Sequence, residues 1–102
     1  MPDIKHYVKI IRPKKPDFNN TMTEEEAAIM SEHFLYLQNL LKEDKLVLAG
    51  PCTDASFGVS IYKVSSYEEA KNIVENDPAV KNGIVTYELK EYRISLFNPN
   101  HK

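Results

Sequence analysis

The sequence predicts an α+β fold in which two helices cover one face of a four-stranded antiparallel sheet. Three observations predict it. Alternating and helical apolar patterns follow one another in the order β-α-β-β-α-β, a short polar link joins the two middle strands, and a chain of 102 residues has room for one hydrophobic core. We therefore expect a single domain over residues 1–97 and a frayed tail over residues 98–102.

The first strand is predicted over residues 4–12, where the sequence IKHYVKIIR alternates loosely in polarity. Residues 13–22 contain two prolines and two asparagines, so we expect a loop there, anchored by Phe18. Thr23 stands three residues before Glu26, which is the spacing of a capping box. The long helix is therefore predicted to begin at Glu24.

This helix is predicted to bury one apolar stripe and to carry His33 on the flank of that stripe. Asp44 is a suitable residue to end the helix, because Asp tolerates the left-handed backbone conformation that ends many helices. The residues that share the stripe at spacings of three and four are Ala27, Met30, Phe34, Leu37 and Leu41, with Leu40 on its flank.

The two middle strands are predicted over residues 46–52 and 57–64. The first, LVLAGPC, is continuously apolar, which is typical of a strand covered on both faces. The second, FGVSIYKV, alternates in polarity. Because only residues 53–56 separate them, we expect an antiparallel hairpin.

The second helix is predicted to begin after Ser65 or Ser66, either of which can cap it. Asp77 should end it, because the residue before Pro78 is pushed out of helical geometry. An Asn-Gly turn at residues 82–83 then leads into a last strand that ends near Phe97. The residues predicted to face the core from this helix are Tyr67, Ala70, Ile73 and Val74.

This order of elements is that of a ferredoxin-like sandwich. The predicted strands carry apolar or aromatic residues on both of their faces, whereas two helices can cover only one face of the sheet. The other face would be an apolar patch larger than monomers usually expose, so we expect a homodimer packed through it.

Composition excludes several classes of protein. The net charge is −2, and the one basic cluster, Arg12, Lys14 and Lys15, is interrupted by prolines, so no nucleic acid partner is expected. No long apolar run or basic leader is present, so we expect no membrane association and a cytoplasmic location. A single cysteine, Cys52, rules out an internal disulfide.

Two residues are candidates for catalysis, and each has a structural alternative. His33 could simply hydrogen-bond to nearby backbone, or it could transfer a proton, since a half-buried imidazole titrates near neutral pH. Capping a short helical turn at Pro78 could be the sole role of Asp77, or its carboxylate could also fix the tautomer of a histidine.

Four further residues are candidates for binding a small-molecule ligand. Gly50 and Pro51 form a strand-ending corner that could also let a ligand approach the backbone. Arg12 could solvate a strand end or pair with a substrate carboxylate. Asp54 could cap a turn or help to shape the pocket. The three histidines lie on different predicted elements, so we expect no metal site, and nothing in the sequence indicates a cofactor.

The stretch HFLYLQNLLKEDKLVLAGP, the strand FGVSIY and the segment SYEEAKNIVENDPAVKNGIVTYELKEY resemble the YciI-like (YCII-related) family of small bacterial proteins over residues 4–96. The resemblance implies a subunit that dimerises into an α+β barrel, and an active-site pair carried here by His33 and Asp77. A related dehydrochlorinase of chlorinated hydroxyquinols implies that proton transfer and elimination are within the reach of the family. Asp44 stands where the family often has glycine.

Two functional hypotheses remain open at this stage. The first is a cofactor-independent enzyme, lyase-like or isomerase-like, in which His33 is the general base or acid and Asp77 orients it. The second is a non-catalytic module that binds a small metabolite in the same cleft of the dimer. The sequence identifies neither the substrate nor the reaction.

Overall fold

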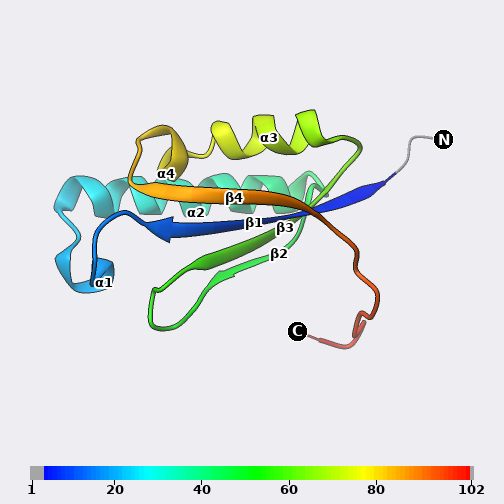
Figure 1. Ribbon diagram of the computed structural model, residues 1–102, viewed down its shortest axis with the longest axis horizontal. Helices are drawn as coiled ribbons and strands as arrows, with labels where there is room; N and C mark the ends of the chain where they lie inside the picture. Colours follow the sequence, from blue (N-terminus) through cyan, green and yellow to red (C-terminus); the bar gives the residue numbers. More distant parts are fainter. Residues whose placement is uncertain (1–3, 102) are drawn as a thin grey trace.

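The computed structural model describes residues 4–101 and shows the predicted α+β architecture. Figure 1 shows α2 and α3 on one side of a four-stranded antiparallel sheet with the strand order β2-β3-β1-β4. The expected first residues of the domain and the last residue of the expected tail lie outside the described residues. The elements are β1 (Lys5–Pro13), α1 (Phe18–Thr21), α2 (Glu24–Lys42), β2 (Leu46–Pro51), β3 (Gly58–Val64), α3 (Tyr67–Glu75), α4 (Pro78–Lys81) and β4 (Val85–Tyr92).

The hydrophobic core lies between the sheet and the two long helices. In the central strand β1, Tyr7, Lys9 and Ile11 are buried and face the helices, because alternate residues of a strand point to the same side. One cluster joins both helices to the sheet, and its members are Tyr7, Leu37, Leu40, Leu46, Tyr62, Val64, Ala70, Ile73 and Val74.

Helix α2 begins where the capping box predicts. The Thr23 hydroxyl accepts from the Glu26 N–H at 3.1 Å, and the Glu26 carboxylate accepts from the Thr23 N–H at 3.0 Å. Asp44 follows the helix with a φ of 61°, as expected for a left-handed exit. Among the described residues, no helix has both the length and the apolar character that crossing a membrane requires.

The side of α2 that faces the core differs from the predicted stripe by part of a helical turn. Leu37 and Leu40 are the buried residues of the helix, whereas Phe34 and Leu41 are 61% and 56% exposed. The apolar stripe is wider than the core contact, and its outer edge faces a cavity instead of packed side chains. This rotation brings His33 toward the core.

The segment over residues 13–22 is not entirely a loop, because residues 18–21 form the short helix α1. Its left-handed cap residue, Asp17, has a φ of 52°, a conformation that Asp adopts more readily than most residues. Phe18 is 6% exposed, so the prediction that it anchors this segment is confirmed.

Strand β2 is not covered on both faces within the described residues, contrary to the prediction. Leu46 is buried, but residues 48–51 are exposed. β2 is an edge strand of the sheet, and its exposed half lines a cavity beside α2. The antiparallel hairpin with β3 is confirmed, with an irregularity between Leu46 and Leu48.

Helix α3 begins after Ser66, whose hydroxyl accepts from the Glu69 N–H at 3.1 Å. The prediction that Ala70, Ile73 and Val74 face the core is confirmed. Tyr67 is 47% exposed, so its predicted burial is wrong. It stands in the first turn at the edge of the core, with its ring 5.9 Å from that of Tyr7.

The last strand, β4, ends at Tyr92 and not near Phe97 as predicted. Tyr92 pairs with His6, near the start of β1, so residues after Tyr92 have no further strand to pair with. Leu96 and Phe97 are 95% and 64% exposed in the segment that follows.

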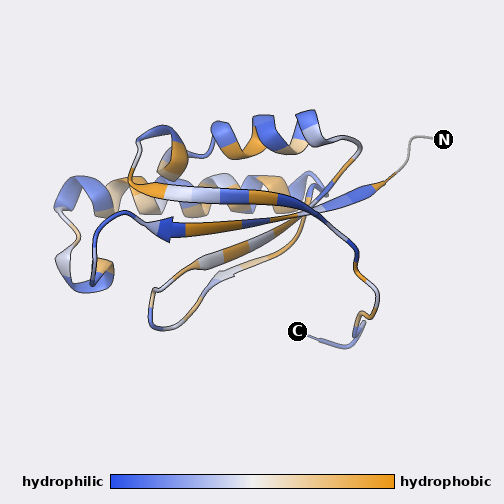
Figure 2. Cartoon of the chain, viewed as in Figure 1, coloured by the Kyte–Doolittle hydropathy of each residue, from blue (hydrophilic) through white to orange (hydrophobic). Residues whose placement is uncertain are grey.

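The second face of the sheet carries no covering layer within the described residues. Figure 2 shows hydrophobic and hydrophilic residues alternating along the strands. The edge strand β4 adds Thr86, Glu88, Lys90 and the aromatic Tyr92 to this face, so its aliphatic residues come from the other three strands. The apolar residues placed there by the strand register are Val8, Ile10, Leu48, Val59 and Ile61.

Candidate functional site

The structure brings the side chains of His33 and Asp77 into contact. Nδ1 of His33 lies 2.7 Å from Oδ1 and 2.8 Å from Oδ2 of Asp77. His33 comes from the middle of α2, and Asp77 comes from the junction between α3 and α4. The His33 side chain is 12% exposed and that of Asp77 is fully buried, so only the imidazole can meet a ligand.

Asp77 is also a helix cap, so its two predicted roles coexist. Its Oδ1 accepts a hydrogen bond from the Ala79 N–H at 2.9 Å, at the start of α4. Pro78 at the first helical position ends α3 and begins α4, as expected for a proline after such a cap. The backbone thus fixes the carboxylate in one orientation toward His33.

Lys9 is a third member of the site that sequence reasoning missed. Its side chain is fully buried, and Nζ lies 3.0 Å from Oδ2 of Asp77. The sequence analysis gives Lys9 no role, although its parity with Tyr7 and Ile11 places it on the covered face of the sheet. That parity is the signal that could have identified it.

Burial and neighbouring groups shift the pKa values of Asp77 and Lys9. Burial raises the pKa of Asp77, but the hydrogen bond from His33 and the charge of Lys9 outweigh it, so this pKa lies below its usual range. Burial lowers the pKa of Lys9, and the charge of Asp77 opposes that shift. Asp77 is therefore a carboxylate at neutral pH.

Two tyrosines stand beside this group. Tyr36 donates a hydrogen bond to the Ile73 carbonyl at 2.7 Å, and burial together with the charges of Asp77 and Glu43 raises its pKa to about 12. Burial, followed by the charge of Asp77, also raises the pKa of Tyr62, whose hydroxyl has no partner among the described residues. Both phenols are neutral at physiological pH.

His33 lines a cavity of about 650 Å³ between α2 and the hairpin of β2 and β3. The lining from residues 4–101 contains no Asp, Glu, Lys or Arg, so His33 is its only readily titratable side chain. Phe34 and Leu41, the exposed edge of the α2 stripe, belong to this lining. The arrangement presents one imidazole to an otherwise largely apolar space.

The other predicted site residues divide between two places. Gly50 and Pro51 line the same cavity as His33. Arg12 lies one residue beyond Ile11, so its side chain points to the opposite face of the sheet, where it pairs with Glu88. It approaches the cavity only by stacking at 6.0 Å on Phe57, so within a single subunit its predicted contact with a substrate carboxylate has no geometric support.

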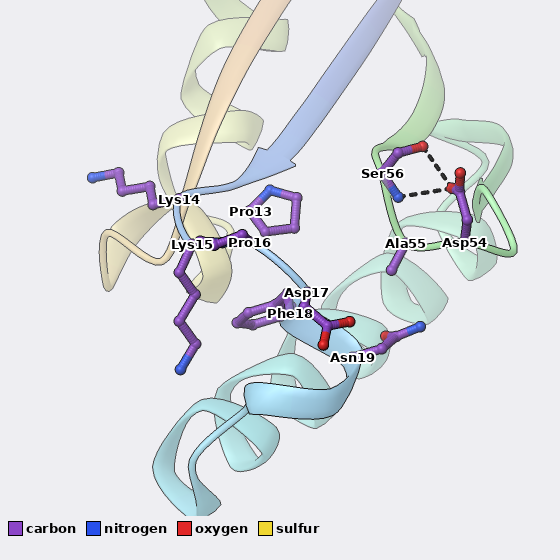
Figure 3. A pocket seen from close by; sticks show the side chains of 10 residues that line it. All are labelled: Pro13, Lys14, Lys15, Pro16, Asp17, Phe18, Asn19, Asp54, Ala55 and Ser56. Atoms are coloured by element: carbon purple, nitrogen blue, oxygen red, sulfur yellow. Dashed lines mark hydrogen bonds between the residues drawn. The ribbon is translucent and has the colours of Figure 1, made fainter.

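Asp54 belongs to an adjoining, more polar cavity of about 390 Å³ (Figure 3). Its carboxylate accepts from the Ser56 N–H at 2.9 Å and from the Ser56 hydroxyl at 2.6 Å, which is the turn-capping alternative. Phe18 contributes to the lining of both this cavity and the one that His33 lines. Within residues 4–101 no group of three His, Cys, Asp or Glu side chains could hold a metal ion.

Known proteins resemble this chain in sequence and in fold. The chain is 34% identical over 62 residues to the uncharacterized protein YjpA of Bacillus subtilis (strain 168), which covers 61% of this chain and 73% of that protein. The structure of the present chain is similar to that of the 5-chloro-2-hydroxyhydroquinone dehydrochlorinase TftG of Burkholderia phenoliruptrix AC1100, which was solved with 2,5-dihydroxybenzoquinone. The TM-score is 0.64 and the sequence identity is 22%. That likeness covers 85% of this chain and 93% of TftG and shows the fold. The profile of the YCII-related domain matches residues 7–93, and the chain therefore belongs to the YCII-related family.

Proposed function

We propose that this protein is a small enzyme that transfers a proton between His33 and a small, neutral, largely apolar molecule. The observation that carries the proposal is the position of His33. Its Nδ1 is held by Asp77, and its ring lines the 650 Å³ cavity. Nε2 is then the nitrogen that meets the substrate.

The proposed mechanism follows from the tautomer that Asp77 selects. A carboxylate can only accept hydrogen bonds, so Nδ1 of the neutral ring carries the hydrogen and Nε2 carries the lone pair. Nε2 takes the proton from the substrate, and the hydrogen bond from Nδ1 to Asp77 keeps the ring oriented while the imidazolium forms. Acid–base catalysis by one positioned side chain contributes about 10²- to 10⁴-fold in rate.

The class of substrate follows from the lining of the cavity. Apart from the imidazole, this lining offers no charged side chain from residues 4–101, so a substrate that is already ionised would lose its hydration without gaining an ion pair. A neutral acid with an aromatic or aliphatic body fits better. The name of TftG supports this class, because it acts on 5-chloro-2-hydroxyhydroquinone, a small aromatic molecule.

We also propose that the active form is a homodimer. The face of the sheet opposite the helices carries five apolar residues in three adjacent strands, namely Val8, Ile10, Leu48, Val59 and Ile61. A second copy of the chain has the same apolar surface and can bury it symmetrically.

The experiment is a turnover assay on a series of small aromatic acids, beginning with chlorinated hydroquinones and measuring chloride release. We expect release with the wild-type protein, background release with His33→Gln, and full release with the control His101→Gln, since His101 lies in the exposed C-terminal segment. Equal release by His33→Gln would contradict the proposal. Saturable binding without any turnover would favour the alternative, a metabolite-binding module.

A further inference from the structure

The buried lysine of β1 is the least expected feature of this site. Lys9 sits at the centre of a central strand, paired in register with Ser60 and Leu89, and its side chain has no exposed surface. Its ammonium group makes its one hydrogen bond with the described residues to Oδ2 of Asp77. A fully buried ammonium group is expensive to desolvate, so a purely structural strand position would favour an apolar residue.

Asp77 therefore has two potential cations as partners, Lys9 on one oxygen and His33 on both. One negative charge balances one positive charge. If Lys9 and His33 were both protonated, the group would carry a net charge of +1 where two of the three side chains are fully buried. Such an uncompensated charge is strongly disfavoured.

The order of proton affinities decides which partner is charged. An alkyl ammonium has an ordinary pKa of about 10.4 and an imidazolium one of about 6.5. The pKa of the lysine would therefore have to fall by about four before the imidazole became the stronger base. Burial lowers the pKa of Lys9, but its ion pair with Asp77 opposes that shift. Overall the pKa of Lys9 lies below its usual value. The large ordinary difference in basicity and the 3.0 Å contact between Nζ and Oδ2 of Asp77 are what favour the proton on Lys9.

No other charge within the described residues alters this balance by direct contact. From α2, Tyr36 is neutral because its pKa is raised to about 12. From β3, Tyr62 is neutral for the same reason, and its ring lies 5.6 Å from the Lys9 nitrogen. Asp77 comes from the cap of α4, and its ion pairs within residues 4–101 are those with Lys9 and His33.

We propose that Lys9 is a positioning residue that neutralises Asp77 permanently and so keeps His33 an uncharged base between turnovers. Asp77 then orients the imidazole without holding it as an imidazolium. Proton transfer from a neutral substrate creates an imidazolium and a substrate anion side by side in the cavity, and the group of charges stays balanced. This inference deepens the proposed function and depends on it for its catalytic meaning, but its test needs no substrate.

The test is nitrogen-15 NMR of the histidine and lysine side chains, with His33 assigned through His33→Gln. In the wild-type protein near pH 7.5 we expect a neutral His33 ring with hydrogen on Nδ1, and a protonated Lys9. A His33 imidazolium, or an uncharged Lys9, under these conditions would overturn the inference. The protonation states are measured in the wild-type protein, and a variant is used only to assign the His33 signals.

The variant Lys9→Met removes the charge and keeps an unbranched side chain. Nζ of Lys9 and Nδ1 of His33 both contact Oδ2 of Asp77, at 3.0 Å and 2.8 Å, so the two nitrogens are at most the sum of these distances apart. At an effective dielectric constant of about 20, their repulsion is then worth at least roughly 2 pH units. The His33 titration in Lys9→Met should move upward by about that amount. The control Lys71→Met removes an exposed charge from α3 and should move it by no more than about 0.2 units.

Equal titrations in Lys9→Met and wild type would show that the lysine has only a structural role. A negative turnover assay would contradict the enzyme proposal and not the proposed charge arrangement. If no substrate class depends on His33 while the NMR results are as expected, the charge arrangement holds and the enzyme proposal does not.

Discussion

Asp77→Asn should destabilise the protein strongly near pH 7 and only weakly near pH 9.5. Asn is as good a helix cap as Asp, so the start of α4 keeps its hydrogen bond from the Ala79 N–H. What the substitution removes is the anion beside Lys9, which is fully buried and then has no counter-charge. The folded protein must release the lysine proton or bury an unpaired charge.

The magnitude follows from the cost of that proton release. An unfolded lysine has a pKa of about 10.4, so releasing its proton at pH 7 costs at most about 4.6 kcal/mol. Removing one partner of a buried ion pair typically costs about 3–5 kcal/mol, which agrees with this limit. At pH 9.5 the same release costs only about 1.2 kcal/mol, since each pH unit is worth about 1.4 kcal/mol.

Urea denaturation of wild type and Asp77→Asn at both pH values measures these differences in the free energy of unfolding. The double variant Lys9→Met with Asp77→Asn removes both charges and should recover most of the loss at pH 7. A loss for Asp77→Asn below about 1 kcal/mol at pH 7, or a loss independent of pH, would refute the reasoning.

Two further predictions concern acid stability and assembly. The pKa of Asp77 is lower in the folded state than its usual 3.8, so its contribution to stability is present above that pH and is lost as the pH falls through the folded value. Denaturation curves in acid should therefore show a smaller pH dependence in Asp77→Asn than in wild type. Ile10→Lys places a charge in the uncovered apolar face and should convert a dimer into a monomer in light scattering, whereas Lys90→Glu at the polar margin of that face should not. A monomeric wild type would contradict the proposed homodimer.

Much of the fold could be predicted from local chemistry. The Thr23–Glu26 capping box predicts the start of α2 because both hydrogen bonds are made within one turn. Asp77 before Pro78 predicts the break between α3 and α4 for the same reason. Such signals do not depend on the rest of the protein.

Features that depend on tertiary partners were harder to predict. The length of β4 is set by where β1 begins, and the coverage of β2 is set by the reach of α2, neither of which appears in the local pattern. The rotation of α2 was misjudged because Phe34 and Leu41 line a cavity that periodicity treats as core.

The candidate site was predicted unevenly. The pairing of His33 with Asp77 came from a family resemblance, because 44 residues separate them and spacing alone could not bring them together. Lys9 was missed because 68 residues separate it from Asp77, although strand parity places it on the same face as Tyr7 and Ile11. Arg12 was assigned by its chemistry, although the same parity places it on the other face of the sheet.

The most direct test of the central claim is a crystal structure of the protein with 2,5-dihydroxybenzoquinone, the molecule bound in the TftG structure. The account predicts that the ligand occupies the cavity between α2 and β2, with one oxygen within hydrogen-bond distance of Nε2 of His33 and with Nδ1 still on Asp77. A ligand bound away from His33, for example on the uncovered face of the sheet, would contradict it.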